Sequence, residues 1–279
     1  MKFHSPEQEK AYHQALKRKF KAAAFDIDGT LTKLAKITIP SRLLIKLGEL
    51  ARQIPFMICS GRDIDHIKNK AANINSDSKN FFIISENGGA THSYDSKKNS
   101  YTELFNIPWP DKIITASELA LVLDKKLPWK IQVKSRDHSI VLYYPPVFYV
   151  FPTLIIHLSK FLAAATRRII KKEGYENYFD VEDSGIGTII IPRESGKGKA
   201  IKRLSQYLKI PLRDFLVVGD MPEPGKNDAE FLSGNYGTAF SVGNQTHNTF
   251  PLPVYNEAGK KLRGPEGTLY LLNEIGIAN

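Results

Sequence analysis

Short apolar runs that each end in polar residues recur along this chain, and this pattern limits the possible folds most strongly. Such runs cover residues 22–25, 55–59, 81–84 and 215–218, and segments with helical periodicity follow several of them. Short runs without polar alternation are typical of strands that are buried on both faces of a parallel sheet. The pattern therefore predicts an α/β fold, with helices covering a parallel sheet and a site beyond the carboxyl ends of its strands.

Residues 91–191 show a different pattern, in which hairpins alternate with helices. This arrangement predicts an inserted α+β module rather than more of the parallel sheet. The core is then expected to consist of residues 22–90 and 192–279. The elements expected around and within the insertion are hairpins at 90–103, 130–144 and 178–191, and helices at 117–127 and 152–173. A short helix is also expected at 227–232, in the core.

Residues 1–21 are predicted to form an N-terminal helical extension. Ser5 is a suitable N-cap, and Pro6 occupies the first helical position, where its missing N–H costs nothing.

The charge of the chain narrows the classes of partner. Its 39 Lys and Arg residues against 29 Asp and Glu residues give a net charge of +10, which suits nucleic acid, anionic lipid or phosphorylated small molecules. The basic residues are scattered, and neither zinc-finger spacing nor an RNA-binding aromatic signature accompanies them. Solvated helix faces explain them better than a nucleic-acid site does.

The compartment is predicted to be the cytoplasm. A single cysteine, Cys59, excludes a disulfide framework and fits a reducing environment. Residues 1–20 lack the apolar core of a signal peptide, and the longest apolar tract is broken by Pro152, His157 and Lys160, so we expect no membrane association.

Three aspartates follow buried strands and form the predicted metal site. Asp26 and Asp28 lie in AFDIDGTLT at 24–32, and Asp220 follows the run at 215–218. Carboxylates at the ends of buried strands are costly without a partner, and carboxylate oxygens are the ligands that Mg²⁺ prefers. We therefore expect a Mg²⁺ site.

Two further segments are expected to bind an anion. Ser60 and Gly61 lie between a buried strand and a helix, where a hydroxyl and backbone N–H groups can hold a phosphate, although a simple helix cap is an equal alternative for Ser60. Lys197 lies at a helix N-terminus, where a cation is unfavourable to the helix dipole unless it serves an anionic ligand.

The sequence resembles the haloacid dehalogenase-like (HAD) hydrolases, whose core is a Rossmann-like parallel sheet. AFDIDGTLT at 24–32, ICSGR at 58–62, SGKGKAI at 195–201 and VVGDMPEPGKNDAE at 217–230 match the four motifs of that superfamily in order. The position of the insertion resembles the type IIB cap subgroup, which includes sugar-phosphate phosphatases and eukaryotic-type phosphomannomutases.

The resemblance implies a role for each motif. Asp26 would be the nucleophile that forms an aspartyl-phosphate, and Asp28 the general acid and then the base. Mg²⁺ would be held by Asp26, the backbone carbonyl of Asp28, and Asp220. Ser60 and Lys197 would bind the phosphoryl oxygens.

The fourth motif departs from the common pattern. Residues 221–226 separate Asp220 from Asn227 and Asp228, as in the phosphomannomutase form. The sequence leaves open whether Asn227 or Asp228 reaches the metal directly or through water.

Substrate choice is expected to reside mainly in the cap. Lys134 and Arg136 on the second hairpin are candidates for reading a second phosphate or a carboxylate, and Glu182 and Asp183 near the third hairpin are candidates for reading sugar hydroxyls. Ordinary exposed positions are at least as good an explanation for each of them. Asn87 at the entry to the cap and Arg62 are further candidates for substrate contacts.

The prediction is a Mg²⁺-dependent phosphatase that acts on a small phosphorylated metabolite, for which a sugar phosphate is the leading candidate. A phosphohexomutase of the phosphomannomutase type is the alternative, weakened because the expected cap holds only three arginines: Arg136, Arg167 and Arg168. A basic nucleic-acid-binding protein on a HAD scaffold is the least favoured interpretation. The sequence predicts no oligomeric state.

Overall fold

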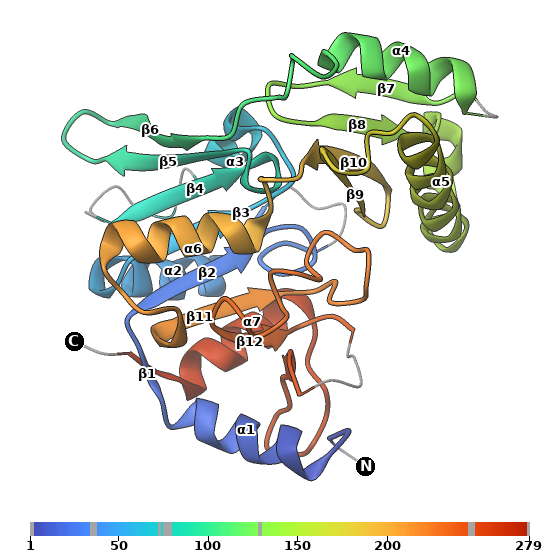
Figure 1. The fold of residues 1–279 in the computed structure, drawn as a ribbon. Helices are drawn as coiled ribbons and strands as arrows, with labels where there is room; N and C mark the ends of the chain where they lie inside the picture. Colours follow the sequence, from blue (N-terminus) through green and yellow to red (C-terminus); the bar gives the residue numbers. More distant parts are fainter. Residues whose placement is uncertain are drawn as a thin grey trace.

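The computed structural model describes residues 3–33, 38–71, 74, 80–127, 130–244 and 249–277. Its core is an eight-stranded sheet with the order β13-β12-β11-β2-β3-β4-β5-β6 (Figure 1). From β13 to β4 neighbouring strands run parallel, whereas β5 and β6 join antiparallel. The bounds are β2 Ala22–Asp26, β3 Phe56–Cys59, β4 Phe81–Ser85, β5 Ala90–Asp95, β6 Ser100–Asn106, β11 Phe215–Gly219, β12 Thr238–Ser241 and β13 Leu252–Pro253. The predicted α/β fold is confirmed.

Apolar packing on both faces explains why the core strands have no polar alternation. In β2, Ala23 and Phe25 belong to one buried cluster, whereas Ala22 and Ala24 belong to the other. Helix α6 covers one face, and helices α2 and α7 cover the opposite face together with α3 (Figure 1). These helices span α2 Ser41–Gln53, α3 Ile64–Ala71, α6 Lys197–Leu208 and α7 Gly264–Glu274.

The N-terminal segment is only partly helical. Helix α1 (Pro6–Leu16) begins at Ser5, whose side chain accepts from the Gln8 N–H at 3.2 Å, as expected. The helix was predicted to reach Lys21, but β1 (Lys19–Phe20) instead pairs parallel with β14 (Gly276–Ile277). Tyr12 of α1 is buried in the core.

The inserted module contains a separate four-stranded antiparallel sheet with the order β7-β8-β10-β9. Helices α4 and α5 pack on one of its faces through an apolar cluster, and the opposite face carries Val141, Ile189 and Ile191 (Figure 1). We call this module the cap. Its elements are α4 Ala116–Lys126, β7 Gln132–Ser135, β8 Ile140–Tyr143, the 3₁₀ turn η2 Pro146–Val150, α5 Pro152–Lys172, β9 Phe179–Asp183 and β10 Gly187–Pro192.

Two further sequence predictions about the fold are wrong. The hairpin at 90–103 was assigned to the insertion, but β5 pairs with β4 and thereby extends the core sheet. The segment 227–232 was predicted to be helical, but it forms consecutive turns. Lys226 forms a bridge with Asp183 of the cap, and the Asp228 carboxylate accepts backbone N–H groups, so this segment is held by contacts that a regular helix does not make.

Within the described residues, we find no helix that combines the length and the apolar character needed to cross a bilayer.

Candidate active site

The polar ends of the parallel strands meet at one edge of the core sheet, beneath the cap. Asp26 ends β2, Ser60 follows β3, and Asp220 follows β11. A pocket of about 70 Å³ lies there. Its lining is Asp26, Asp28, Ser60, Gly61, Arg62, Asp220, Met221 and Asn227 from the core, and Tyr143, Ser184, Ile186 and Ile189 from the cap.

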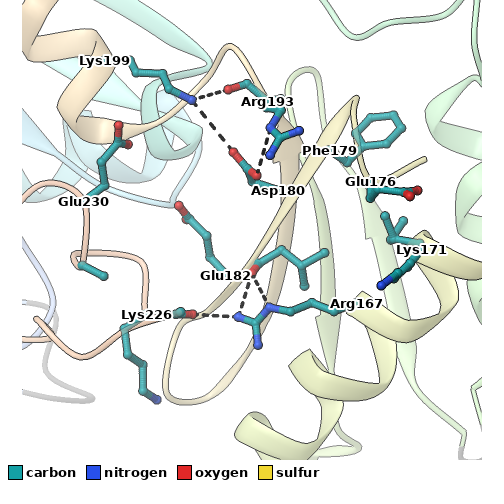
Figure 2. Close-up of a pocket in the computed structure, with 14 residues that line it drawn as sticks. Arg167, Lys171, Glu176, Phe179, Asp180, Glu182, Arg193, Lys199, Lys226 and Glu230 are labelled. Atoms are coloured by element: carbon teal, nitrogen blue, oxygen red, sulfur yellow. Dashed lines mark hydrogen bonds and ion pairs between the residues drawn. The ribbon is translucent and has the colours of Figure 1, made fainter. Parts of the chain in front are cut away.

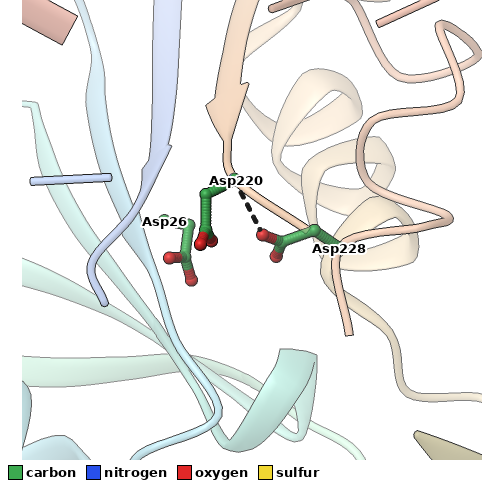
Figure 3. A group of neighbouring side chains, drawn as sticks. All are labelled: Asp26, Asp220 and Asp228. Carbon is green, nitrogen blue, oxygen red and sulfur yellow. Dashed lines mark hydrogen bonds between the residues drawn. The ribbon is translucent and has the colours of Figure 1, made fainter. Parts of the chain in front are cut away.

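Three carboxylates converge at the base of this edge. Asp26, Asp220 and Asp228 each offer an oxygen atom, and these atoms lie within 4.8 Å of one another (Figure 3). Gly29 permits the close approach, because a Cβ atom there would lie 2.2 Å from Asp220 Oδ2. The cluster carries an excess of negative charge that suits a cation.

Lys197 lies between two of these carboxylates. Its Nζ donates to Asp26 Oδ1 and to Asp228 Oδ1, both at 2.6 Å, and its side chain is completely buried. The first turn of α6 places it there, since Gly196 adopts φ +130° just before the helix. The helix dipole disfavours a cation at this position, and the two carboxylates compensate.

The buried charges perturb one another's pKa values. Burial, reinforced by the neighbouring carboxylate of Asp228, raises the pKa of Asp26 to about 7 even though Lys197 opposes the change. Burial and the charges of Asp228 and Asp26 also raise the pKa of Asp220. Burial alone would lower the pKa of Lys197, but Asp228 and Asp26 outweigh it and raise the pKa.

Asp28 has a different environment from Asp26. It accepts from Lys70 Nζ at 2.7 Å and from Arg62 Nε at 3.3 Å. Burial alone would raise the pKa of Asp28, but the two cations outweigh it and lower the pKa. Arg62, predicted as a substrate contact, lines the pocket and pairs with Asp28.

The carboxylate oxygens of Asp26 and Asp220 are suitable ligands for a hard cation such as Mg²⁺. Asp228 is already engaged, because its Oδ1 holds Lys197 and its Oδ2 accepts the N–H groups of Asp220 and Met221 at 3.2 and 3.3 Å. Asn227 Oδ1, in contrast, is buried without a hydrogen-bond partner in the residues that the structure describes, and Asn227 lines the pocket. A cation or its bound water would satisfy this unpartnered oxygen, in the pocket that Asp26 and Asp220 also line.

The segment after β3 is held from the cap. Arg136 Nη1 donates to the carbonyl oxygen of Gly61 at 2.6 Å, so this arginine grips the loop rather than lining the pocket. Ser60 Oγ accepts from the Arg62 N–H at 3.2 Å. Lys134, a predicted substrate contact, is exposed on β7 and away from the pocket lining.

Asn87 is completely buried and does not line the pocket. Its Nδ2 donates to Oε2 of Glu182, on cap strand β9, at 2.6 Å. Burial raises the pKa of Glu182 to about 8, although the charge of Lys197 opposes this.

A second, larger cavity of about 620 Å³, which Glu182 lines, lies between the cap and the core (Figure 2). Arg167 donates there to the carbonyl oxygens of Val181 and Gly225, and thus links the cap to the core. Lys199 and Arg193 both face Asp180 at 3.9 Å. Three other charged residues of the lining, Glu182, Lys226 and Glu230, are bound to side chains outside it.

Sequence reasoning missed the groups that support the site from outside the four motifs. Lys70 lies near the end of α3, Glu182 is on β9, and Lys226 forms a buried ion pair with Asp183 at 2.6 Å. The sequence suggests Glu182 and Asp183 only as readers of sugar hydroxyls or as ordinary exposed residues. No local signal marks Lys70, because its partner Asp28 is distant in sequence.

Two protein-family models and one curated relative match parts of this chain. Residues 23–121 match the family model of the haloacid dehalogenase-like hydrolases, and residues 184–262 match that of sucrose-6F-phosphate phosphohydrolase. A phosphoglycolate phosphatase from Methanothrix thermoacetophila is 25% identical over 201 residues, which cover 72% of this chain and 76% of the relative.

Solved structures share the fold. TM0651 from Thermotoga maritima superposes with a TM-score of 0.61 at 16% identity, covering 93% of this chain and 98% of its own. The N-terminally truncated, IMP-bound IMP-nucleotidase of Plasmodium falciparum has a TM-score of 0.63 at 13% identity, covering 94% of this chain and 69% of its own.

Proposed function

We propose that this chain, which belongs to the haloacid dehalogenase-like hydrolases and is a phosphatase, requires Mg²⁺ for its activity. We further propose that it hydrolyses a small sugar phosphate through an aspartyl-phosphate. The observation that carries the proposal is the buried Asp26 carboxylate, which lines the pocket while Lys197 binds its Oδ1 at 2.6 Å. The names of the similar proteins support a small phosphomonoester as substrate.

Asp26 is the proposed nucleophile. Its carboxylate attacks phosphorus, the bond from phosphorus to the ester oxygen breaks, and the phosphoryl group remains on Asp26. Lys197 keeps Asp26 in place and supplies positive charge, and Ser60 and Gly61 offer a hydroxyl and an N–H group to the phosphoryl oxygens.

Asp28 is the proposed proton carrier. It gives a proton to the departing ester oxygen and later takes one from the water that attacks phosphorus. Lys70 and Arg62 favour the ionised form, which suits the second step. An arriving phosphate dianion competes for Arg62 and raises the pKa of Asp28, which favours the protonated form needed in the first step.

Asp26, Asp220 and the backbone carbonyl of Asp28 are the proposed ligands of Mg²⁺, with Asn227 directly or through water. When bound, the ion neutralises phosphate charge and orients the displacement. Because Asp228 is saturated by Lys197 and two N–H groups, we assign it to the positioning of Lys197 rather than to the metal.

The cap arginines favour a phosphatase over a phosphohexomutase. A mutase must grip a second phosphate while it returns the first. Arg136 is bound to Gly61, Arg167 is bound to two carbonyl oxygens, and Arg168 is exposed on α5. None of the three lines the catalytic pocket.

The pocket volume limits what can be bound in this arrangement. About 70 Å³ is far below the roughly 300–1,000 Å³ of ordinary ligand sites. It suits the phosphoryl group alone, so the leaving group requires displacement of Tyr143, Ser184, Ile186 or Ile189 on the cap.

A screen of phosphorylated metabolites with and without Mg²⁺ tests the proposal. We expect Mg²⁺-dependent phosphate release from at least one sugar phosphate, and Asp26→Asn should abolish it without unfolding the protein. Paired hexose 1- and 6-phosphates belong in the screen, because interconversion without free phosphate would establish the mutase instead. Salt-sensitive nucleic-acid binding with no phosphate release would favour the nucleic-acid interpretation.

A further inference from the structure

The backbone of Asn87 joins the two segments that are proposed to bind phosphate. Its N–H donates to the carbonyl oxygen of Ser60 at 2.9 Å, and its own carbonyl oxygen accepts from the N–H of Gly196 at 2.8 Å. Ser60 is itself a proposed phosphate ligand, and Gly196 immediately precedes Lys197. The distance between Ser60 and Lys197 therefore depends on the position of the Asn87 backbone.

The backbone around Asn87 adopts a conformation that needs external support. Glu86, Asn87 and Gly88 have successive φ angles of +47°, +51° and +89°. Non-glycine residues seldom adopt such angles, and they cluster at functional sites when they occur. A Cβ atom on Gly88 would lie 2.3 Å from the carbonyl oxygen of Gly196, so the turn is pressed against the start of α6.

The cap holds both side chains of this turn. Glu86 accepts from the His138 N–H at 3.1 Å and from Ser139 Oγ at 2.6 Å. Asn87 Nδ2 donates to Glu182 Oε2 at 2.6 Å. Of these contacts, only the one from Glu182 holds Asn87, whose backbone is hydrogen-bonded to both Ser60 and Gly196.

Asn87 has little freedom to find another partner. Its side chain is completely buried, and a Cβ atom on Gly61 would lie 3.0 Å from its Oδ1, so the amide fills the space beside the phosphate-binding loop. Without the carboxylate of Glu182, the Asn87 amide group would be buried with an unsatisfied N–H donor.

We propose that Glu182 and Asn87 form a positioning pair, in which the cap carboxylate fixes the Asn87 amide and so sets the spacing between Ser60 and Lys197. This inference rests on the proposed function, since it assumes that Ser60 and Lys197 act on one phosphoryl group. Neither residue lines the catalytic pocket, so their effect passes through the two segments that they hold.

The test compares single and double variants with para-nitrophenyl phosphate as substrate and Mg²⁺ present. Glu182→Ala and Asn87→Ala are each expected to lower kcat by about 10- to 100-fold and to raise KM, because misplacing the phosphate-binding groups on the ångström scale costs this much. The double variant should lose no more than either single one, because both remove the same contact. Glu182→Gln keeps an oxygen acceptor for Asn87 Nδ2 and should retain most of kcat.

Arg167→Met is the matched control. Arg167 also ties the cap to the core, through Val181 and Gly225, but it does not touch the turn at 86–88. If Glu182 merely anchored the cap, Arg167→Met would lower kcat as much as Glu182→Ala. That result, or an unchanged kcat in Glu182→Ala, would overturn the inference. Thermal unfolding and near-ultraviolet circular dichroism establish that each variant is folded.

A binding measurement separates failure of this inference from failure of the proposed function. If the wild-type protein hydrolyses no phosphomonoester, the proposed function fails. Calorimetric titration with inorganic phosphate still tests the pair: Glu182→Ala is expected to bind phosphate at least about tenfold more weakly, whereas equal affinity would overturn the inference.

Discussion

Replacing Lys197 with methionine should strongly destabilise the protein, in a way that depends on pH. Two unit charges 2.6 Å apart attract by about 6 kcal/mol at an effective dielectric constant near 20, and Lys197 makes two such pairs. Removing the ammonium group also removes its own desolvation cost, which offsets several kcal/mol. We therefore expect a net loss of about 3–5 kcal/mol in the free energy of unfolding at pH 8, as for other buried pairs that lose one partner.

The sign of the pH dependence follows from the pKa of Asp26. The folded-state pKa is already raised to about 7 with Lys197 present, and removal of the cation raises it further. A raised carboxyl pKa means that the folded state binds the proton more tightly than the unfolded state, so stability falls as pH rises through this range. The loss of unfolding free energy caused by Lys197→Met should accordingly be smaller at pH 5 than at pH 8.

Urea unfolding at pH 5 and pH 8, in the presence of a chelator, measures this difference. Lys199→Met is the matched control, since Lys199 lies one position beyond Gly198 on the same helix and faces Asp180 at 3.9 Å near the surface. Its loss should stay within about 1 kcal/mol. Equal losses for the two variants at pH 8, or a Lys197→Met deficit that does not change with pH, would refute the electrostatic reasoning.

Three further predictions concern the surroundings of the site. Lys70→Met should cost about 1–3 kcal/mol of unfolding free energy at pH 7. Because the pKa of Asp28 is lowered in the folded state, urea unfolding should show this cost shrinking as the pH falls below about 4 and through that lowered pKa, where protonation removes the pairing; a cost that does not change with pH would contradict this. Lys226→Met should cost about 3–5 kcal/mol by leaving the Asp183 carboxylate buried without its cation, and combining it with Asp183→Asn should recover part of the loss. Mg²⁺ should raise the unfolding temperature of the wild-type protein, as expected for a ligand that binds only the folded state, and Asp220→Asn should abolish that rise; an equal shift in the variant would exclude Asp220 as a ligand.

The sequence predicts the core and its strand ends well, because both follow from local patterns. Runs such as 55–59 have the length and composition of strands buried on both faces, and a parallel sheet necessarily brings their carboxyl ends to one edge. Asp26, Ser60 and Asp220 therefore lie together, as expected. The hairpin at 90–103 was misplaced because hairpin residues do not specify which sheet edge they join.

Contacts between distant residues lie beyond prediction from local patterns. Arg136 was considered as a substrate contact because it is a cation on the cap, yet the structure turns it toward the carbonyl oxygen of Gly61. Glu182 and Lys70 have ordinary sequence surroundings, and their partners are far away along the chain. Three-dimensional packing alone determines which charges become buried and paired.

The pairing of β2 with β11 has a consequence for how the chain folds. Ala22 lies opposite Phe215, and the whole cap is encoded between them. During synthesis, β2, β3 and β4 and the cap therefore leave the ribosome before the strand that covers one edge of β2 has been made. Such long-range strand pairing is slow, and an open strand edge is a site where other chains can pair. Asp26 can meet Lys197 and Asp220 only after residues 197–220 have been synthesised, so the site cannot form on a shorter nascent chain.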